Sequence, residues 1–318
     1  MTGGLTGEPR IWALHLAVLA LIAAALAGLP LYHSNVLARV LVLAVFAMGY
    51  NLAFGYTGLL SLGHALFFAA GMYGAGLGAK VLGLPAGAAL LAGALAGAAL
   101  AGLVGLLALR TAGVSFMIVT LMFAQAGYLT LLYFGAVTGG DEGFIIPDAS
   151  RVLMGARLSE DGPRAVAAFV LFATALLACL ALIRSRFGRV MVAMRENEER
   201  SRMLGYDPFR VKLGALTLSG LYAGAAGAAY GVLFGYVGAN FATIQYSILP
   251  MLYVLLGGAG VVLGPFLGAL IMFYLIDIAS AYTTAHLMVV GVALVVLVLF
   301  APRGILGTLR DRVVRGLP

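Results

Sequence analysis

The hydrophobic positions of this chain form long continuous runs, separated by short polar stretches. The runs cover residues 11–31, 36–54, 61–80, 84–109, 113–135, 164–183, 213–238, 244–257, 264–280 and 285–301. A helix needs about 20 apolar residues to cross a bilayer, so most of these ten runs are long enough. The run 244–257 is short, and we expect it to be tilted, re-entrant or broken. The pattern predicts an all-α, polytopic membrane protein, because the strands of a membrane barrel would alternate in polarity.

The charged residues between the runs predict an orientation. Loop 184–212 carries eight basic and four acidic residues, a net charge of +4, whereas loop 136–163 carries two basic and five acidic residues, a net charge of −3. Basic loops stay on the cytoplasmic side of a membrane. Loop 184–212 and the tail 302–318 are therefore expected in the cytoplasm and loop 136–163 outside. Six runs precede loop 184–212 and four follow it, so both termini are predicted to be cytoplasmic.

The composition agrees with this class. The chain is 63% hydrophobic and 10% charged, with a mean hydropathy of +1.08, whereas soluble domains are about 25% charged. We expect residues 1–318 to form a single transmembrane domain. The net charge of +7 does not indicate nucleic-acid binding, because the basic residues flank the spans. Arg10 and run 11–31 resemble a signal peptide, but the length of the run favours an uncleaved first helix.

Several kinds of chemistry have no motif here. There is no GxxxxGK[ST] phosphate loop, no HExxH motif and no histidine cluster, and Cys179 is the single cysteine. We therefore expect no catalytic residue, no cofactor, no metal and no enzyme activity in this chain. Asp277 is the clearest ionisable residue inside a run. Two interpretations remain open for it, a relay in ion-coupled transport and a position near the outer water interface.

Two glycine-rich stretches are poor sequences for a continuous helix. They are GYTGLLSLGH at 55–64 and GGAGVVLGP at 257–265. Irregular backbone at membrane depth is tolerated only inside protein or beside a water-filled cavity. We therefore regard these stretches as a candidate substrate path. For His64 itself, a structural hydrogen bond is favoured over a role in lining the path. The glycine pairs 93/97 and 220/224 predict close helix packing instead.

The most charged stretch, RFGRVMVAMRENEERSRMLGY at 186–206, predicts a helix from Arg189 to Leu204. Glu196 with Arg200, and Glu198 with Arg202, are i,i+4 pairs of about 0.2–0.5 kcal/mol each. Met191 and Met194 share one face of this helix. Gly205 can adopt the left-handed conformation that ends it. Asp207 and Pro208 are typical of the N-cap and first position of a following helix. A solvated loop and a helix that docks on a partner are both compatible with this pattern.

The motifs occur in an order that resembles a known family. RENEERSRMLGYDPFRVK, GYTGLLSLGHALFFAAGMY, TGGDEGF at 138–144, LGGAGVVLGPFLGA and APRGILG are similar to motifs of permease subunits in bacterial branched-chain amino acid ABC importers. The resemblance covers about residues 36–307 and is closest to the LivM-type subunit. The acidic pair Asp141–Glu142 departs from the pattern expected there. The exact substrate, whether a branched-chain amino acid, another amino acid, urea or an amide, is therefore left open.

The resemblance implies partners and site residues. A LivH-like second permease would complete the pore, two cytosolic ATPase subunits would supply energy, and a periplasmic amino-acid-binding protein would deliver substrate at the bacterial inner membrane. Residues expected to couple to the ATPase are Arg189, Met194, Arg195, Glu196, Glu198, Arg202 and Gly205. Residues expected along the substrate path are Gly58, Ser61, Gly63, His64, Gly139, Gly140 and Gly258.

Two other classes of function compete with this one. An ion-driven carrier or channel would act without ATPase subunits, and Asp277 with the broken segments motivates it. A scaffold would only anchor a cytosolic partner through the charged helix. The irregular stretches argue against a scaffold, which needs no cavity.

Overall fold

The computed structural model describes residues 8–282, residues 285, 288, 291, 292 and 295, and the segment 303–308, with side chains from residue 11 onward. Most of the predicted tenth span, 285–301, and most of the predicted tail, 302–318, lie outside the described residues. The account below concerns the described part of the chain.

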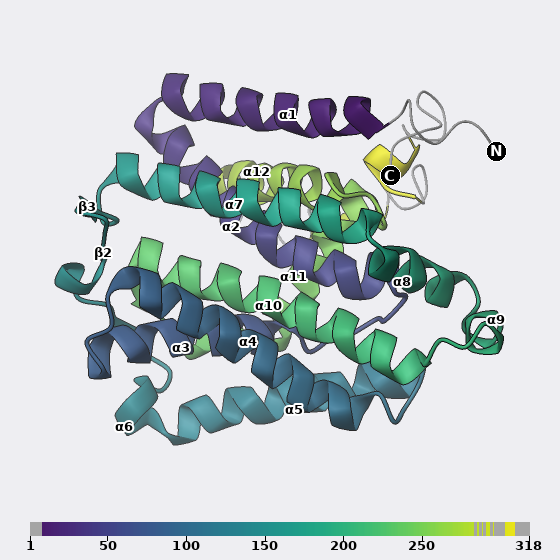
Figure 1. Cartoon of the computed structure of the whole chain (residues 1–318). Helices are drawn as coiled ribbons and strands as arrows, with labels where there is room; N and C mark the ends of the chain where they lie inside the picture. The colour runs from purple at the N-terminus through teal and green to yellow at the C-terminus, as the bar shows by residue number, and fades with distance from the viewer. Residues whose placement is uncertain are drawn as a thin grey trace.

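Nine helices correspond to the first nine predicted runs (Figure 1). They are α1 (Glu8–Gly28), α2 (Leu31–Asn51), α3 (His64–Val81), α4 (Ala86–Ala108), α5 (Val114–Tyr133), α7 (Asp161–Arg184), α10 (Pro208–Phe234), α11 (Ile244–Gly257) and α12 (Gly264–Tyr282). Seven of the described helices are long and apolar enough to cross a membrane. The predicted all-α, polytopic membrane class is therefore confirmed. Helix α11 has 14 residues with Pro250 inside it. Its length of about 21 Å is short of the roughly 30 Å hydrocarbon core.

The long helices lie side by side, and the short elements gather at the two ends of the bundle. At one end, on the right of Figure 1, lie α8 (Arg186–Glu196) and α9 (Glu198–Met203). We call this the α8–α9 end. At the other, called the β-strand end, lie α6 (Gly135–Thr138), the 3-10 turn η2 (Asp148–Ser150) and the small strands. The 3-10 turn η3 (Ala239–Ala242) follows the last strand.

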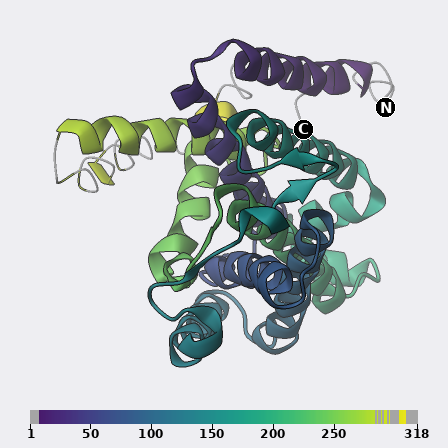
Figure 2. The same cartoon turned by 90° about the vertical axis from the view of Figure 1, so that its left-hand side faces the viewer.

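The strands were not predicted from the sequence. Strand β1 (Phe144–Ile145) pairs antiparallel with β4 (Tyr236–Val237), with Phe144 opposite Val237. Strands β2 (Val152–Leu153) and β3 (Ala156–Arg157) form a second antiparallel pair. Figure 2 views the molecule from this end, with α12 extending sideways from the bundle. Each strand has only two residues, too few to produce the alternation by which a strand is recognised.

Helices α2 and α10 form the centre of the bundle. In their most apolar stretches, 94% and 72% of the residues are buried. Small residues allow α10 to approach α3 and α4 closely. A Cβ atom at Gly97 of α4 would lie 2.5 Å from the Cα of Gly224, and one at Gly71 of α3 would overlap the backbone of Gly224. The predicted small-residue interfaces at 93/97 and 220/224 are therefore confirmed as contacts between α4 and α10.

Candidate functional site

The chain between α2 and α3 is irregular inside the bundle. Helix α2 ends in a π-helical turn, η1 (Leu52–Tyr56), and residues 57–63 then run without helix to His64, the first residue of α3. Side chains from other helices satisfy the backbone of this stretch. Leu62 N donates to Thr120 Oγ1 of α5 at 3.2 Å, and Ala65 N donates to Ser247 Oγ of α11 at 3.0 Å. These side chains pair backbone N–H groups that a continuous helix would otherwise pair, as backbone at membrane depth requires.

His64 and Ser61 lie within this region and are fully buried. The Nε2 of His64 lies 2.7 Å from Ser219 Oγ, and Ser219 donates in turn to the carbonyl oxygen of Gly49 at 2.6 Å. Ser61 Oγ accepts from Gly63 N at 3.1 Å. In this conformation the groups therefore join α2, α3 and α10, which agrees with the structural interpretation of His64. A path-lining role for Ser61, Gly63 and His64 stays a prediction.

The two glycine-rich stretches lie against each other. Asn51, the last residue of α2, accepts from Gly260 N at 2.9 Å through Oδ1 and donates to the carbonyl oxygen of Val261 at 3.0 Å through Nδ2. A Cβ at Gly55 would overlap Asn51 Oδ1 and lie 2.6 Å from Gly260 N. The contact therefore requires glycine at 55. We call Asn51, Gly55, Gly58, Gly260 and Val261 the glycine-loop junction.

Arg195 of α8 reaches into the glycine-loop junction. Its Nη1 donates a hydrogen bond to the carbonyl oxygen of Gly55. Its Cγ lies 3.4 Å from the position of a Cβ at Gly58, and its Nη1 lies 2.9 Å from that of a Cβ at Gly260. Gly58 and Gly260 both have positive φ, 78° and 75°. One guanidinium on α8 therefore contacts both irregular stretches.

The charged segment is two helices, so the prediction of one helix from Arg189 to Leu204 is wrong. Asn197 separates α8 from α9 with φ −159° and ψ 101°, and its side chain caps α9 by accepting from Arg200 N at 2.8 Å. Asparagine prefers this N-cap position because its oxygen satisfies a free N–H. The pair Glu196–Arg200 spans the break and loses its helical spacing. The pair Glu198–Arg202 forms, at 3.6 Å.

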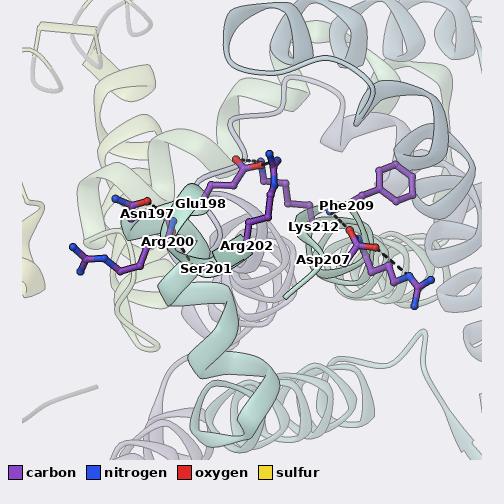
Figure 3. Close-up of polar contacts among 9 residues, drawn as sticks. Asn197, Glu198, Arg200, Ser201, Arg202, Asp207, Phe209 and Lys212 are labelled. Atoms are coloured by element: carbon purple, nitrogen blue, oxygen red, sulfur yellow. Dashed lines mark hydrogen bonds and ion pairs between the residues drawn. The ribbon is translucent and has the colours of Figure 1, made fainter. Parts of the chain in front are cut away.

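A compact corner joins α9 to α10 (Figure 3). Gly205 has φ 87° and Asp207 Oδ1 accepts from Phe209 N at 2.9 Å, as the sequence predicted for a left-handed stop and an N-cap. Lys212 of α10 donates to Glu198 Oε2 of α9 at 2.6 Å, and Figure 3 shows this contact beside the one to Arg202. The ion pair, the cap and the turn hold α9 in one position on the start of α10.

The predicted coupling residues divide into two groups in the structure. Met194 is buried together with Met191, at 3% and 0% exposure, so both methionines pack inward. Arg189, Arg195, Glu196 and Arg202 are exposed, and Glu198 is partly exposed. The corner presents large apolar side chains that sequence reasoning missed, Met203, Leu204 and Tyr206, at 80%, 71% and 45% exposure. Their presence in a charged loop is the signal that could have identified them. We call these three residues the apolar corner.

A surface cavity of about 890 Å³ lies at the same end. The lining comes from residues 57–60, the α4–α5 linker with the first turn of α5, the α8–α9 segment (194–198 and Arg202), and the start of α10. Gly58 and Arg195 therefore form part of one wall. Gly258, with φ 123°, lies nearby against the segment 303–307, where its Cβ position is 2.9 Å from Gly307 N.

Gly139 and Gly140 lie at the β-strand end, away from the other predicted path residues. Both have positive φ, and Gly140 N donates to Thr138 Oγ1 at 3.2 Å. Close by, buried Arg151 donates to the carbonyl oxygens of Val232 and Leu233, both at 2.6 Å, and so caps the end of α10. Burial lowers the pKa of the Arg151 guanidinium, and the nearby Asp148 carboxylate opposes this.

Asp277 lies toward the β-strand end, where Tyr32 at the start of α2 donates to its two carboxylate oxygens at 3.0 and 3.2 Å. Tyr32 is 58% exposed. Asp277 therefore lies beside an exposed side chain near the start of α2, and both interpretations of this residue stay predictions. Among the described residues there is no group of three or more His, Cys, Asp or Glu that could hold a metal ion.

A bundle of long apolar helices, with irregular backbone inside it and a charged segment at one end, defines a polytopic membrane protein. Residues 32–301 match the family model described as branched-chain amino acid transport system / permease component, and the chain belongs to this family. It is a multi-pass membrane permease subunit.

Named relatives agree with the family. The high-affinity branched-chain amino acid transport system permease protein LivM of Escherichia coli is 29% identical over 290 residues, which cover 84% of this chain and 68% of LivM. The probable branched-chain amino acid transport permease protein LivM of Methanocaldococcus jannaschii is 34% identical over 28% of this chain and 26% of its own. The autoinducer 2 import system permease protein LsrC of Klebsiella pneumoniae is 36% identical over 28% of this chain and 27% of its own. No solved structure matches the chain.

Proposed function

We propose that this chain is the pore subunit of an ATP-driven importer for branched-chain or related amino acids. The single observation that carries the ATP-driven part is the α8–α9 segment, which presents the apolar corner outward while Arg195 donates a hydrogen bond to Gly55 at the end of α2. The chain carries no phosphate loop of its own. Separate ATPase subunits would then hydrolyse ATP, and this chain would be no enzyme.

The charge balance supports an orientation for this function. The segment 184–212 has a net charge of +4, which favours the cytoplasmic side, whereas loop 136–163 at the β-strand end has a net charge of −3. The α8–α9 end would therefore face the cytoplasm of a bacterial inner membrane. The cavity beside Gly58 would be the inner mouth of the path, and the β-strand end would receive the periplasmic binding protein.

The apolar corner is the proposed contact with the ATPase. Helix α9 lies at the far end of the molecule, beyond most of the long helices (Figure 1). Met203 ends this helix and Leu204 and Tyr206 follow it, and all three side chains are exposed. Exposed apolar groups with charged neighbours of both signs are typical of a protein interface core and its rim. A second, LivH-like permease would complete the pore across the membrane.

The ion-driven alternative has less support than the ATP-driven importer. It was motivated by Asp277, whose side chain lies beside the half-exposed Tyr32 and not at the centre of the bundle. A proton or sodium relay needs ionisable groups within the membrane.

The test is reconstitution of this chain with its co-expressed second permease, ATPase subunits and binding protein in proteoliposomes. We expect uptake of radiolabelled leucine, isoleucine or valine that requires ATP. The variant Leu204→Asp should lose the ATPase subunits on purification. Met154→Asp is the matched control, because Met154 is equally apolar and 101% exposed at the opposite end. Uptake by the permeases alone, without ATPase subunits, would refute the proposal.

A further inference from the structure

A carbonyl group at the end of α2 receives its hydrogen bond from a side chain of α8. A helix leaves its last carbonyl oxygens without partners inside the helix and carries partial negative charge there. Gly55 lies in η1, the final turn of this helix, and its carbonyl oxygen accepts from Arg195 Nη1. A positive side chain at this point is doubly favourable, because it donates a hydrogen bond and opposes the helix dipole.

The same guanidinium lies on the loop that follows α11. The Cβ position of Gly260 is 2.9 Å from Arg195 Nη1, so a side chain at this position would displace the guanidinium. Asn51 ties this loop to the end of α2 through Gly260 N and Val261 O. A displacement of Arg195 would therefore act on both irregular stretches together, since they are joined to each other.

The stem of Arg195 passes Gly58, which lines the cavity at the α8–α9 end. Met194, one residue earlier, is 3% exposed and holds α8 on the bundle. Arg195 therefore lies in the segment that is proposed to bind the ATPase. It also lines the cavity that is proposed as the inner mouth of the path.

We propose that Arg195 is a positioning residue, which transmits the movement of α8 to both glycine loops and so opens or closes the inner mouth of the path. This inference rests on the proposed function. Arg195 then acts within this chain, whereas the apolar corner makes the ATPase contact. The distinction can be measured, because loss of docking and loss of transmission affect different quantities.

The experiment uses the complete reconstituted complex and measures three quantities: ATPase subunits that co-purify, ATP hydrolysed, and leucine taken up. For Arg195→Gln we expect normal co-purification and at least half of the wild-type hydrolysis, with leucine uptake per ATP reduced tenfold or more. Arg195→Lys keeps a charged donor that can reach one carbonyl, so it should restore uptake at least threefold over the Gln variant. Arg186→Gln is the matched control, because Arg186 is an exposed arginine in the first turn of the same helix.

Two results would overturn the proposal. One is uptake per ATP within twofold of wild type in Arg195→Gln. The other is loss of the ATPase subunits from that variant, which would make Arg195 a docking residue. If the Arg195→Gln subunit does not fold, Gly260→Ala, whose Cβ would displace the guanidinium from the opposite side, decides by the same criterion. A wild-type complex without ATP-dependent uptake refutes the proposed function itself, and is recognised before any variant is compared.

Discussion

Asn51 at the end of α2 and Gly260 in the loop after α11 are held by a hydrogen bond of 2.9 Å across 209 residues of sequence. The amide nitrogen of the same side chain donates to Val261 O at 3.0 Å. Asn51 is 1% exposed, so it substitutes for the water that the turn 260–261 would otherwise need. The relationship joins the two glycine-rich stretches that the sequence marks as irregular.

Replacing Asn51 with Leu should destabilise the protein strongly. The leucine has a similar size but leaves one backbone donor and one acceptor without partners, at about 1–3 kcal/mol each. We expect the midpoint of thermal unfolding in detergent to fall by about 5–10 °C. Asn240→Leu is the control, because Asn240 is exposed at the β-strand end, and it should change the midpoint by less than about 2 °C. Equal midpoints for the two variants would contradict the role given to Asn51.

Gly205→Val should impair transport while the subunit still folds. Nothing lies within 4 Å of a Cβ at Gly205, so crowding has no part in the effect. The cause is φ 87°, which a β-branched residue adopts only with strain. We expect ATP-dependent leucine uptake to fall at least fivefold. Gly205→Asn should retain more than half of the uptake, because asparagine tolerates this conformation. Normal uptake by the Val variant would count against the coupling segment as described.

Arg151→Met should lower stability through the end of α10. The carbonyl oxygens of Val232 and Leu233 would lose their donor in buried surroundings, at a cost of about 1–3 kcal/mol each. Thermal unfolding monitored by circular dichroism should shift down by about 6–12 °C. The comparison is Arg157→Met, since Arg157 is an exposed arginine in the same loop. A shift as small as that of the Arg157 variant would show that the cap contributes little.

Gly224→Ala tests the packing of α10 on α4. The added Cβ would lie 2.8 Å from Gly97 Cα and 2.9 Å from Gly93 O, which are backbone atoms that cannot move aside. Overpacking of this kind costs about 1–3 kcal/mol, so the yield of folded monomer in gel filtration should fall. Gly162→Ala, where a Cβ meets open space in α7, should fold at least as well as wild type. Similar yields from both variants would exclude close backbone contact at Gly224.

Much of the fold and part of the site follow from local sequence properties. Continuous apolar runs indicated nine of the helices that the structure describes, because a helix in lipid must be apolar along its whole length. Gly205 and Asp207 identified a stop and a cap from residue type alone, since few residues suit those backbone positions. The break at Asn197 was missed, because a single asparagine in a polar helix carries a weak signal.

Only the tertiary structure decided which distant groups meet. The sequence by itself determined a polytopic helical membrane protein, its charged segment and two irregular glycine-rich stretches. It did not place Arg195 on Gly55 and Gly260, turn Met194 inward, or separate Gly139 and Gly140 from Gly58. These relationships depend on how helices far apart in the chain pack together, and small residues permit many close pairings. The choice among such pairings is made by the sum of long-range contacts, which no local stretch of sequence contains.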